Sequence, residues 1–242
     1  MKNTRSCAAA GSILIAAVLG LGLATSSRAQ AETPRRTDNG KTLVVPAEQA
    51  AKGTVYYVVP GKPGANADQT RFTNTPPNKK HAKSIAAFTG FSNATVGYVV
   101  ASSGDPQRLV AGEFILPVDS LDTGIRLRNK HLGKKLWLDK ESHPDIHFSL
   151  KGVRGLKPAD SGAGADSSTG VIFGQMTIHG VTKDFSFPAT ISVRPADNLI
   201  AIRTHYAVPL ADFDVSNGII GNKVANKIVV EQFLILSTEK PS

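Results

Sequence analysis

Short runs in which apolar and polar residues alternate dominate the chain from residue 54 onward. In the run 185–193 every odd position is apolar, and the runs 145–153 and 199–210 alternate in a similar way. Such alternation places one set of side chains inside and the other in water, because successive side chains of a strand point to opposite faces of the sheet. Proline- and glycine-rich turns separate the runs, as in an antiparallel barrel or sandwich. The predicted strands are 55–59, 69–74, 84–89, 95–102, 108–118, 145–153, 171–179, 185–193, 199–210 and 227–236.

One segment does not follow this pattern. The residues from Asp122 to about Leu132 predict a short helix, whose first turn Asp122 or Thr123 can cap and which Gly133 can end. No regular alternation of strands and helices is present, which argues against a parallel α/β fold. We therefore predict an all-β fold, an antiparallel barrel of about eight strands with one short helix. A barrel of this size either fills its interior with side chains or encloses one slender ligand, and the pattern does not decide between them.

The N-terminal residues are typical of a secretory signal peptide. Lys2 and Arg5 precede an uncharged apolar run, and small residues lead to an A-x-A site that ends at Ala31. The alternative is a membrane anchor, but the run is rich in alanine and glycine and no second apolar span follows. We expect a signal peptide at residues 1–31, cleavage after Ala31, and a periplasmic or secreted mature protein. The polar residues 32–53 predict a flexible leader, and the barrel is expected at residues 54–238.

Charge and cysteine content narrow the functions that the chain can have. Cleavage would remove Cys7, the only cysteine, so the mature chain could form neither a disulfide nor a thiolate metal site. It would also remove Lys2, Arg5 and Arg28 and no acidic residue, which lowers the formal net charge from +9 to +6. A basic surface can attract anionic lipid headgroups or envelope polyanions, and simple solubility explains it equally well. Nucleic-acid binding does not fit a secreted protein.

Catalytic motifs are absent from the sequence. It contains no G-x-S-x-G, H-E-x-x-H, P-loop or dinucleotide-binding glycine motif, so we expect a binding protein and not an enzyme. His131, His143 and His147 support an alternative, a zinc or copper site. The last two are four residues apart, but on a strand this spacing spans about 13 Å, which is too far for one ion. The metal site is therefore the weaker hypothesis, and no metal is expected.

Two motifs resemble signatures of the YceI-like family. The first is LDTGIRLRNKHLGKKLWLDKESHPDIHF at 121–148, and the second is GQMTIHGVTK at 174–183. YceI-like proteins are secreted lipocalin-like barrels that hold polyisoprenoid lipids. The resemblance covers roughly residues 55–238 and implies an eight-stranded antiparallel barrel whose short helix lies near the barrel mouth. It also implies a carrier of an isoprenoid quinone or a polyprenyl phosphate, with no cofactor besides the bound lipid.

The resemblance further implies a hollow barrel with an apolar lining. The residues expected to contact the lipid are Phe114, Leu116, Leu132, Trp137, Ile146, Phe148, Phe185, Phe187, Ile191, Ile202, Tyr206 and Phe233. The candidates for contact with its headgroup are Arg126, Arg128 and His131. Filling the tunnel through Ala189→Trp is then expected to abolish lipid retention. In the second motif, Gly180 is expected to supply the geometry of a hairpin turn.

Partners follow from the same resemblance. A membrane surface is the expected donor or acceptor of the lipid, and a homodimer is compatible with a family whose members are often dimeric. Without the resemblance, a solid barrel that acts as an interaction module on acidic envelope surfaces remains the alternative.

Overall fold

The computed structural model describes residues 34–38, 40–61, 69–77, 87–159 and 166–242. The predicted signal peptide lies outside these residues, as do residues 84–86 of the predicted third strand. The described residues form ten antiparallel strands. Their bounds are β1 (Gly53–Val58), β2 (Thr70–Asn74), β3 (Phe88–Ser92), β4 (Val96–Ser102), β5 (Asp105–Pro117), β6 (Asp145–Pro158), β7 (Ser167–Ile178), β8 (Val181–Arg194), β9 (Leu199–Pro209) and β10 (Lys227–Ser237). Nine of the ten predicted strands match these bounds closely, whereas the third, predicted at 84–89, overlaps β3 only at residues 88 and 89.

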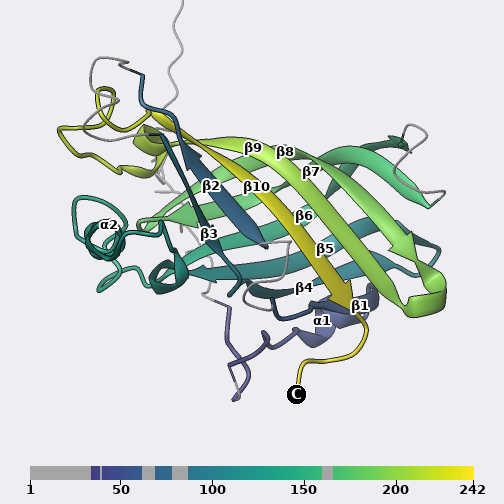
Figure 1. Ribbon diagram of the computed structural model, residues 1–242. Helices are drawn as coiled ribbons and strands as arrows, with labels where there is room; N and C mark the ends of the chain where they lie inside the picture. The colour runs from purple at the N-terminus through teal and green to yellow at the C-terminus, as the bar shows by residue number, and fades with distance from the viewer. Residues whose placement is uncertain (1–33, 39, 62–68, 78–86, 160–165) are drawn as a thin grey trace, which may run out of the picture. The chain divides into compact units, whose positions relative to one another are not determined.

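Eight of these strands close into a barrel, as predicted. They follow the order β1-β4-β5-β6-β7-β8-β9-β10. The ring is completed where the end of β10, at Leu236 and Ser237, pairs with β1. Earlier along its length β10 pairs with β2, which in turn pairs with β3. These two strands therefore extend the sheet beside the barrel (Figure 1). Strand β6 continues beyond its predicted end at residue 153 to Pro158, and β7 begins at Ser167, before its predicted start at residue 171.

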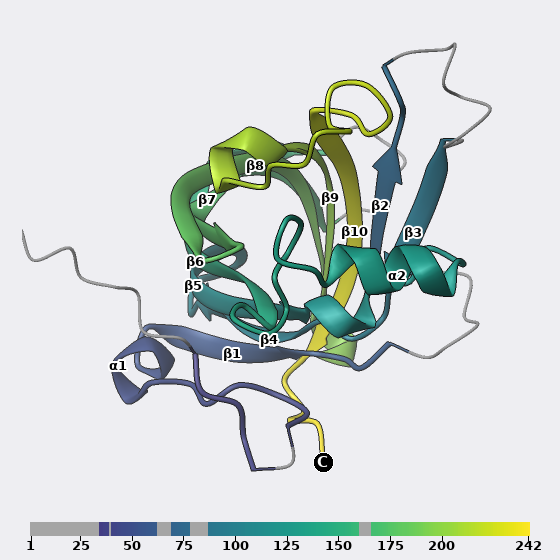
Figure 2. The ribbon, with the colours of Figure 1, turned by 90° about the vertical axis from the view of Figure 1, so that its left-hand side faces the viewer.

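Few helices accompany the strands. The structure contains α1 (Ala47–Ala50) and α2 (Arg126–Leu132), together with short 3-10 turns at Val118–Ser120, Pro195–Asp197 and Leu210–Phe213. Figure 2 looks into one end of the barrel and shows α2 beside the opening, next to β2 and β3. No helix among the described residues has the length and apolar character needed to cross a bilayer.

Helix α2 begins later than predicted and has a different start. Ile125 occupies its N-cap position and makes no capping hydrogen bond through its side chain. Asp122 instead accepts hydrogen bonds from the backbone of Gly124 (2.8 Å) and from the amide of Asn129 (2.9 Å). The predicted capping residue thus builds a turn before the helix. Gly133 ends the helix as expected.

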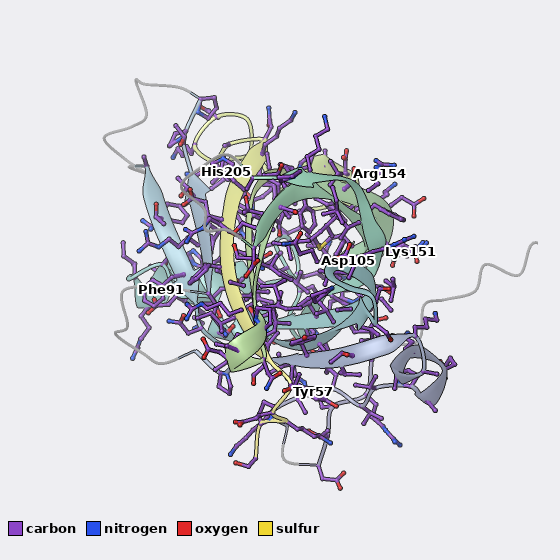
Figure 3. All side chains as sticks on the ribbon, turned by 90° about the vertical axis from the view of Figure 1, so that its right-hand side faces the viewer. Tyr57, Phe91, Asp105, Lys151, Arg154 and His205 are labelled. Atoms are coloured by element: carbon purple, nitrogen blue, oxygen red, sulfur yellow. The ribbon has the colours of Figure 1, made fainter. Side chains whose placement is uncertain are left out.

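Inward and outward faces alternate along the barrel strands. The inner faces of β8 and β9 carry the apolar residues that the pattern predicted, and Ile191, Ile200 and Leu236 are fully buried at the end opposite α2. Lys151 and Arg154 of β6 point away from the barrel wall (Figure 3). The end of the barrel opposite α2, which we call the closed end, is therefore filled with side chains. A cavity inside the barrel can lie only at the α2 end.

The described part of the predicted leader packs on the barrel, so the expectation of a flexible segment is wrong for these residues. Leu43 is fully buried in a second core that contains Tyr98, Val100, Ala111 and Ile115. These residues lie on the outer faces of β4 and β5, where apolar side chains need cover from water. Polar contacts add to the apolar ones, since Arg36 pairs with Asp145 at 2.9 Å and the Tyr98 hydroxyl donates to Gln49 at 2.8 Å.

Candidate functional site

A cavity of about 780 Å³ occupies the barrel interior at the α2 end. Its size lies within the roughly 300–1,000 Å³ typical of small-molecule sites. Most of its wall is apolar and comes from the inner faces of β5 to β10 and from Leu210 and Phe213 of the 3-10 turn that follows β9. The deeper lining residues include Leu150, Ile172, Met176, Ile202 and Leu234. The barrel is thus hollow, which contradicts the solid-barrel alternative.

The mouth of the cavity combines apolar and basic side chains. Leu127 and Leu136 line the cavity and are 62% and 61% exposed, and Ile125 is 49% exposed. The cationic lining residues Arg128, Lys134 and Lys135, together with His131, all belong to α2 and the loop that follows it. The opening therefore presents exposed apolar side chains beside a cluster of basic residues from α2 and its loop.

The β7–β8 hairpin holds the loop at the mouth. His179 and Gly180 have φ values of 51° and 75°, the positive values that a two-residue hairpin turn requires. The His179 Nε2 lies 3.2 Å from the backbone oxygen of Lys135, and the His179 ring packs edge-on against His143 at 5.7 Å between centroids. The predicted turn role of Gly180 is confirmed, and the hairpin also positions the loop residue Lys135.

A second set of contacts fixes the start of α2. The Asn129 amide oxygen accepts hydrogen bonds from the backbone N–H of Thr123 (2.9 Å) and from its hydroxyl (2.6 Å). The hydrogen bonds from Asn129 and Gly124 lower the pKa of Asp122 below its usual value. Arg128 lies over the Phe88 ring at 4.0 Å, which joins α2 to β3. Hydrogen bonds and the Arg128–Phe88 contact therefore fix the position of α2 at the mouth.

Apart from Asn217 and the basic residues of α2 and its loop, the polar side chains of the lining are Thr70, Thr95, Thr204, Tyr206 and Gln232. Gln232 lies opposite Thr204 of β9 and opposite Thr70 of β2 in the sheet register. Tyr206 donates to the Gln232 amide oxygen (3.2 Å), and the Gln232 amide donates to Thr70 (3.2 Å). The hydroxyls of Thr70 and Thr95 are 3.3 Å apart. We call this group the polar row.

One member of the polar row has no partner. Thr204 is 5% exposed, and its hydroxyl makes no hydrogen bond within the described structure. A buried hydroxyl without a partner costs about 1–3 kcal/mol, so such groups are rare and need an explanation.

Aromatic side chains adjoin the polar row. Tyr206 stacks on Phe187 with 4.5 Å between centroids, and Phe187 contacts Phe148 at 5.1 Å. Burial raises the pKa of Tyr206 far above its usual value, so its hydroxyl stays a neutral donor. Flat aromatic faces and neutral hydrogen-bonding groups therefore lie side by side on the cavity wall.

Most of the predicted site residues line the cavity. The predicted residues in the lining are Phe114, Leu116, Leu132, Trp137, Ile146, Phe148, Phe187, Ile202, Tyr206, Arg128 and His131.

Four predicted residues do not line it. Phe185 shares the inward face of β8 with Phe187 and packs against the lining residues Tyr206 and Phe213, and Ile191 lies in the packed closed end. Phe233 faces outward under Arg203, whose guanidinium lies 4.6 Å from the ring centroid. Arg126 is exposed on α2, two residues from Arg128 and therefore on another side of the helix.

Ala189 is also absent from the lining, although its cross-strand neighbour Thr204 belongs to it. Tryptophan at this position would therefore displace packed side chains before it filled the cavity. A lining residue with more space around it is the better position for a test.

The three histidines of the metal hypothesis have separate surroundings. His147 pairs with Glu113 at 2.6 Å on the outer face, His143 packs against His179, and His131 is exposed at the mouth. Among the described residues, no group of three or more histidine, cysteine, aspartate or glutamate side chains could hold a metal ion. The metal hypothesis therefore gains no support from the described residues.

The polar row and the exposed leucines were missed at the sequence level. Thr204 and Gln232 lie 28 residues apart in the sequence, and only strand pairing brings them together. Leu127 and Leu136 were not among the predicted site residues, because nothing in the sequence marks them as exposed. The inward phase of β9 was a usable clue, since it places Thr204 on the face of Ile202 and Tyr206.

Comparisons with known proteins agree with this architecture. The sequence profile of the YceI-like domain matches residues 66–233. BcnA from Burkholderia cenocepacia superposes with a TM-score of 0.52 and 16% identity, over 69% of this chain and 94% of BcnA. A polyisoprenoid-binding domain from Saccharophagus degradans, implicated in plant cell wall breakdown, superposes with a TM-score of 0.51 and 15% identity, over 77% of this chain and 99% of that domain. A comparison with curated proteins gives no match.

Proposed function

We propose, because this chain belongs to the YceI-like family, that it is a non-catalytic protein that binds a lipid inside its barrel. The cargo is a long-chain isoprenoid of the quinone or polyprenyl phosphate type. The observation that carries the proposal is the apolar cavity of about 780 Å³ behind an open mouth. Transfer of the lipid tail from water to such a wall is favourable by about 25 cal/mol per Å² of apolar area. The name of the Saccharophagus degradans domain, polyisoprenoid-binding, supports the same class of cargo.

The mouth supports exchange of the cargo with a membrane. Leu127 and Leu136 are the two most exposed of the large apolar residues that the structure describes, and both line the cavity. Lys134 and Lys135 beside them attract anionic headgroups. A membrane that covers this surface would receive or supply the lipid through the opening.

The location belongs to the same proposal. The first 31 residues have the composition of a signal peptide, and we propose that the protein is periplasmic or secreted and begins at Glu32 after cleavage. N-terminal sequencing of the protein recovered from its own envelope tests this directly. A chain that still begins at Met1 would contradict it.

Native mass spectrometry after purification from the native envelope, followed by organic extraction, tests the function. We expect a bound species with isoprene-spaced fragments. The variant Val230→Trp, on the cavity side of β10, is expected to lose it, because the added ring occupies the volume of the tail. The matched control Ile235→Trp places the same ring on the outer face of β10, where Ile235 is 38% exposed, and should keep the lipid.

Two results would contradict the proposal. One is wild-type protein that stays empty after incubation with quinones and polyprenyl phosphates. The other is lipid that co-purifies with a folded Val230→Trp variant, because the cavity would then not be the binding site.

A further inference from the structure

The polar row lies inside a largely apolar cavity. A cargo made only of hydrocarbon could not form hydrogen bonds with it. Three of its members, Thr70, Thr204 and Gln232, come from adjacent strands and lie at the same level of the wall. Polar groups at buried positions weaken apolar binding unless they meet a partner. The row therefore indicates that the cargo carries a polar atom to this depth.

The unused hydrogen-bonding capacity of the row defines the chemistry of that atom. The Thr204 hydroxyl is unpartnered, and rotation about χ1 exchanges it with the methyl group and turns it toward the cavity. The Gln232 amide uses one N–H on Thr70 and retains a second. Both groups can donate to an oxygen, and the hydroxyl can also accept a hydrogen bond.

Charge excludes an anionic headgroup from this place. The charged lining residues Arg128, Lys134 and Lys135, together with His131, belong to α2 and its loop. The strands that carry the row contribute only uncharged side chains to the lining, Tyr206 among them, because burial keeps its hydroxyl protonated. A diphosphate at the row would leave water without a cation opposite it, which is strongly unfavourable. An uncharged oxygen incurs no such penalty.

We infer that the polar row is a recognition site for the carbonyl or hydroxyl oxygen of an uncharged isoprenoid headgroup. The inference rests on the proposed function and selects among its cargoes, against the polyprenyl phosphates. The stacked rings of Tyr206 and Phe187 beside the row offer a face to a planar ring, which places quinones above simple alcohols.

Titration with four ligands that share a branched tetraprenyl carbon skeleton tests the inference. Three carry the unsaturated tail: a tetraprenyl benzoquinone, geranylgeraniol and geranylgeranyl diphosphate. The fourth is phytane, the saturated hydrocarbon without a headgroup. Trp137, the only tryptophan, lines the cavity, so quenching of its fluorescence reports binding. Competition against a fluorescent fatty acid provides a second readout for the ligands that do not quench.

The decisive variant is Thr204→Val, which removes the hydroxyl and keeps the shape. We expect about threefold to tenfold weaker binding of the quinone, in keeping with one neutral hydrogen bond, and unchanged binding of phytane. The control Thr190→Val makes the same change at a position on the outer face of β8 and should leave all four affinities unchanged. The double variant Lys134→Gln/Lys135→Gln should weaken only the diphosphate.

The outcomes separate the inference from the function on which it rests. If none of the four ligands binds the wild-type protein, the proposed function itself fails. Equal quinone affinity of the wild type and the folded Thr204→Val variant would overturn the inference alone, and water would then be the partner of the hydroxyl. Tighter binding of the diphosphate than of the quinone by the wild type would overturn it as well.

Discussion

At the scale of single residues, Gly180 shows how one position joins the fold to the site. It completes the turn between β7 and β8 with a φ of +75°, and a Cβ built there would lie 2.4 Å from the Cε1 atom of His143. The absence of a side chain thus allows both the turn and the packing of the mouth loop on the hairpin. The His143 ring also packs edge-on against the His179 ring. Because Gly180 has no side chain, it leaves room for the His143 ring in this position.

Gly180→Ala should lower the free energy of unfolding by about 2–4 kcal/mol, because alanine is strained at positive φ and its methyl group would displace the His143 ring. Gly155→Ala is the matched control, since Gly155 has a φ of +66° with open space around its Cβ position. It should cost only about 1 kcal/mol, from the backbone alone. Urea unfolding measures both. Equal losses for the two variants would show that the His143 contact contributes nothing.

Residue orientation was predictable where alternation is regular and failed where it is not. The inward phase of β8 follows from apolar residues at every second position. In β10, apolar residues occupy 228–230 and 233–236 almost continuously, so either phase fits the sequence. Register with β9 decides, and it turns Gln232 inward and Phe233 outward. The polar glutamine inside the barrel is what sequence reasoning could not anticipate.

At the scale of elements, α2 and its loop form a lid whose position depends on its neighbours. The helix has seven residues, too few for stability in isolation. Asn129 holds its start, and the hairpin at His179 holds the loop at Lys135. The sequence predicted the helix and its end at Gly133. The anchor at His179 could not be predicted, because it joins residues that are 44 positions apart in the chain.

The exposed leucines of this lid predict binding to anionic membranes. Leu127→Ser/Leu136→Ser should weaken binding to phosphatidylglycerol-containing vesicles at least about tenfold, because each leucine contributes about 1.5–3 kcal/mol when it leaves water. Vesicle flotation measures the loss. Val59→Ser/Ile235→Ser removes apolar residues that are 38% exposed elsewhere on the molecule and should bind as the wild type does. Wild-type affinity in the lid variant would mean that this surface does not contact the membrane.

At the scale of the whole molecule, two cores share one barrel wall. The inner core closes one end and leaves the cavity at the other, and the outer core lies between β4, β5 and the segment around Leu43. Alternation predicted the barrel, but a hollow and a filled barrel have the same pattern of inward residues. A hollow and a filled barrel differ in the summed volume of their inward side chains relative to the space inside, and no single strand determines that difference. The outer core was missed because the apolar run Leu43–Val45 is only three residues long and lies within a polar segment.

Substitutions should be able to perturb the outer core without affecting the cavity, because Ile115 is the only residue of the outer core that also lines the cavity. Leu43→Ala should lower the free energy of unfolding by about 2–4 kcal/mol, because it leaves a void in a fully packed site. Leu136→Ala makes the same change at a residue that is 61% exposed and should stay within about 0.5 kcal/mol of the wild type. Urea unfolding gives both values, and lipid retention of folded Leu43→Ala should remain that of the wild type. A small effect of Leu43→Ala would mean that residues 34–50 contribute little to stability, and that the barrel withstands water on the outer faces of β4 and β5.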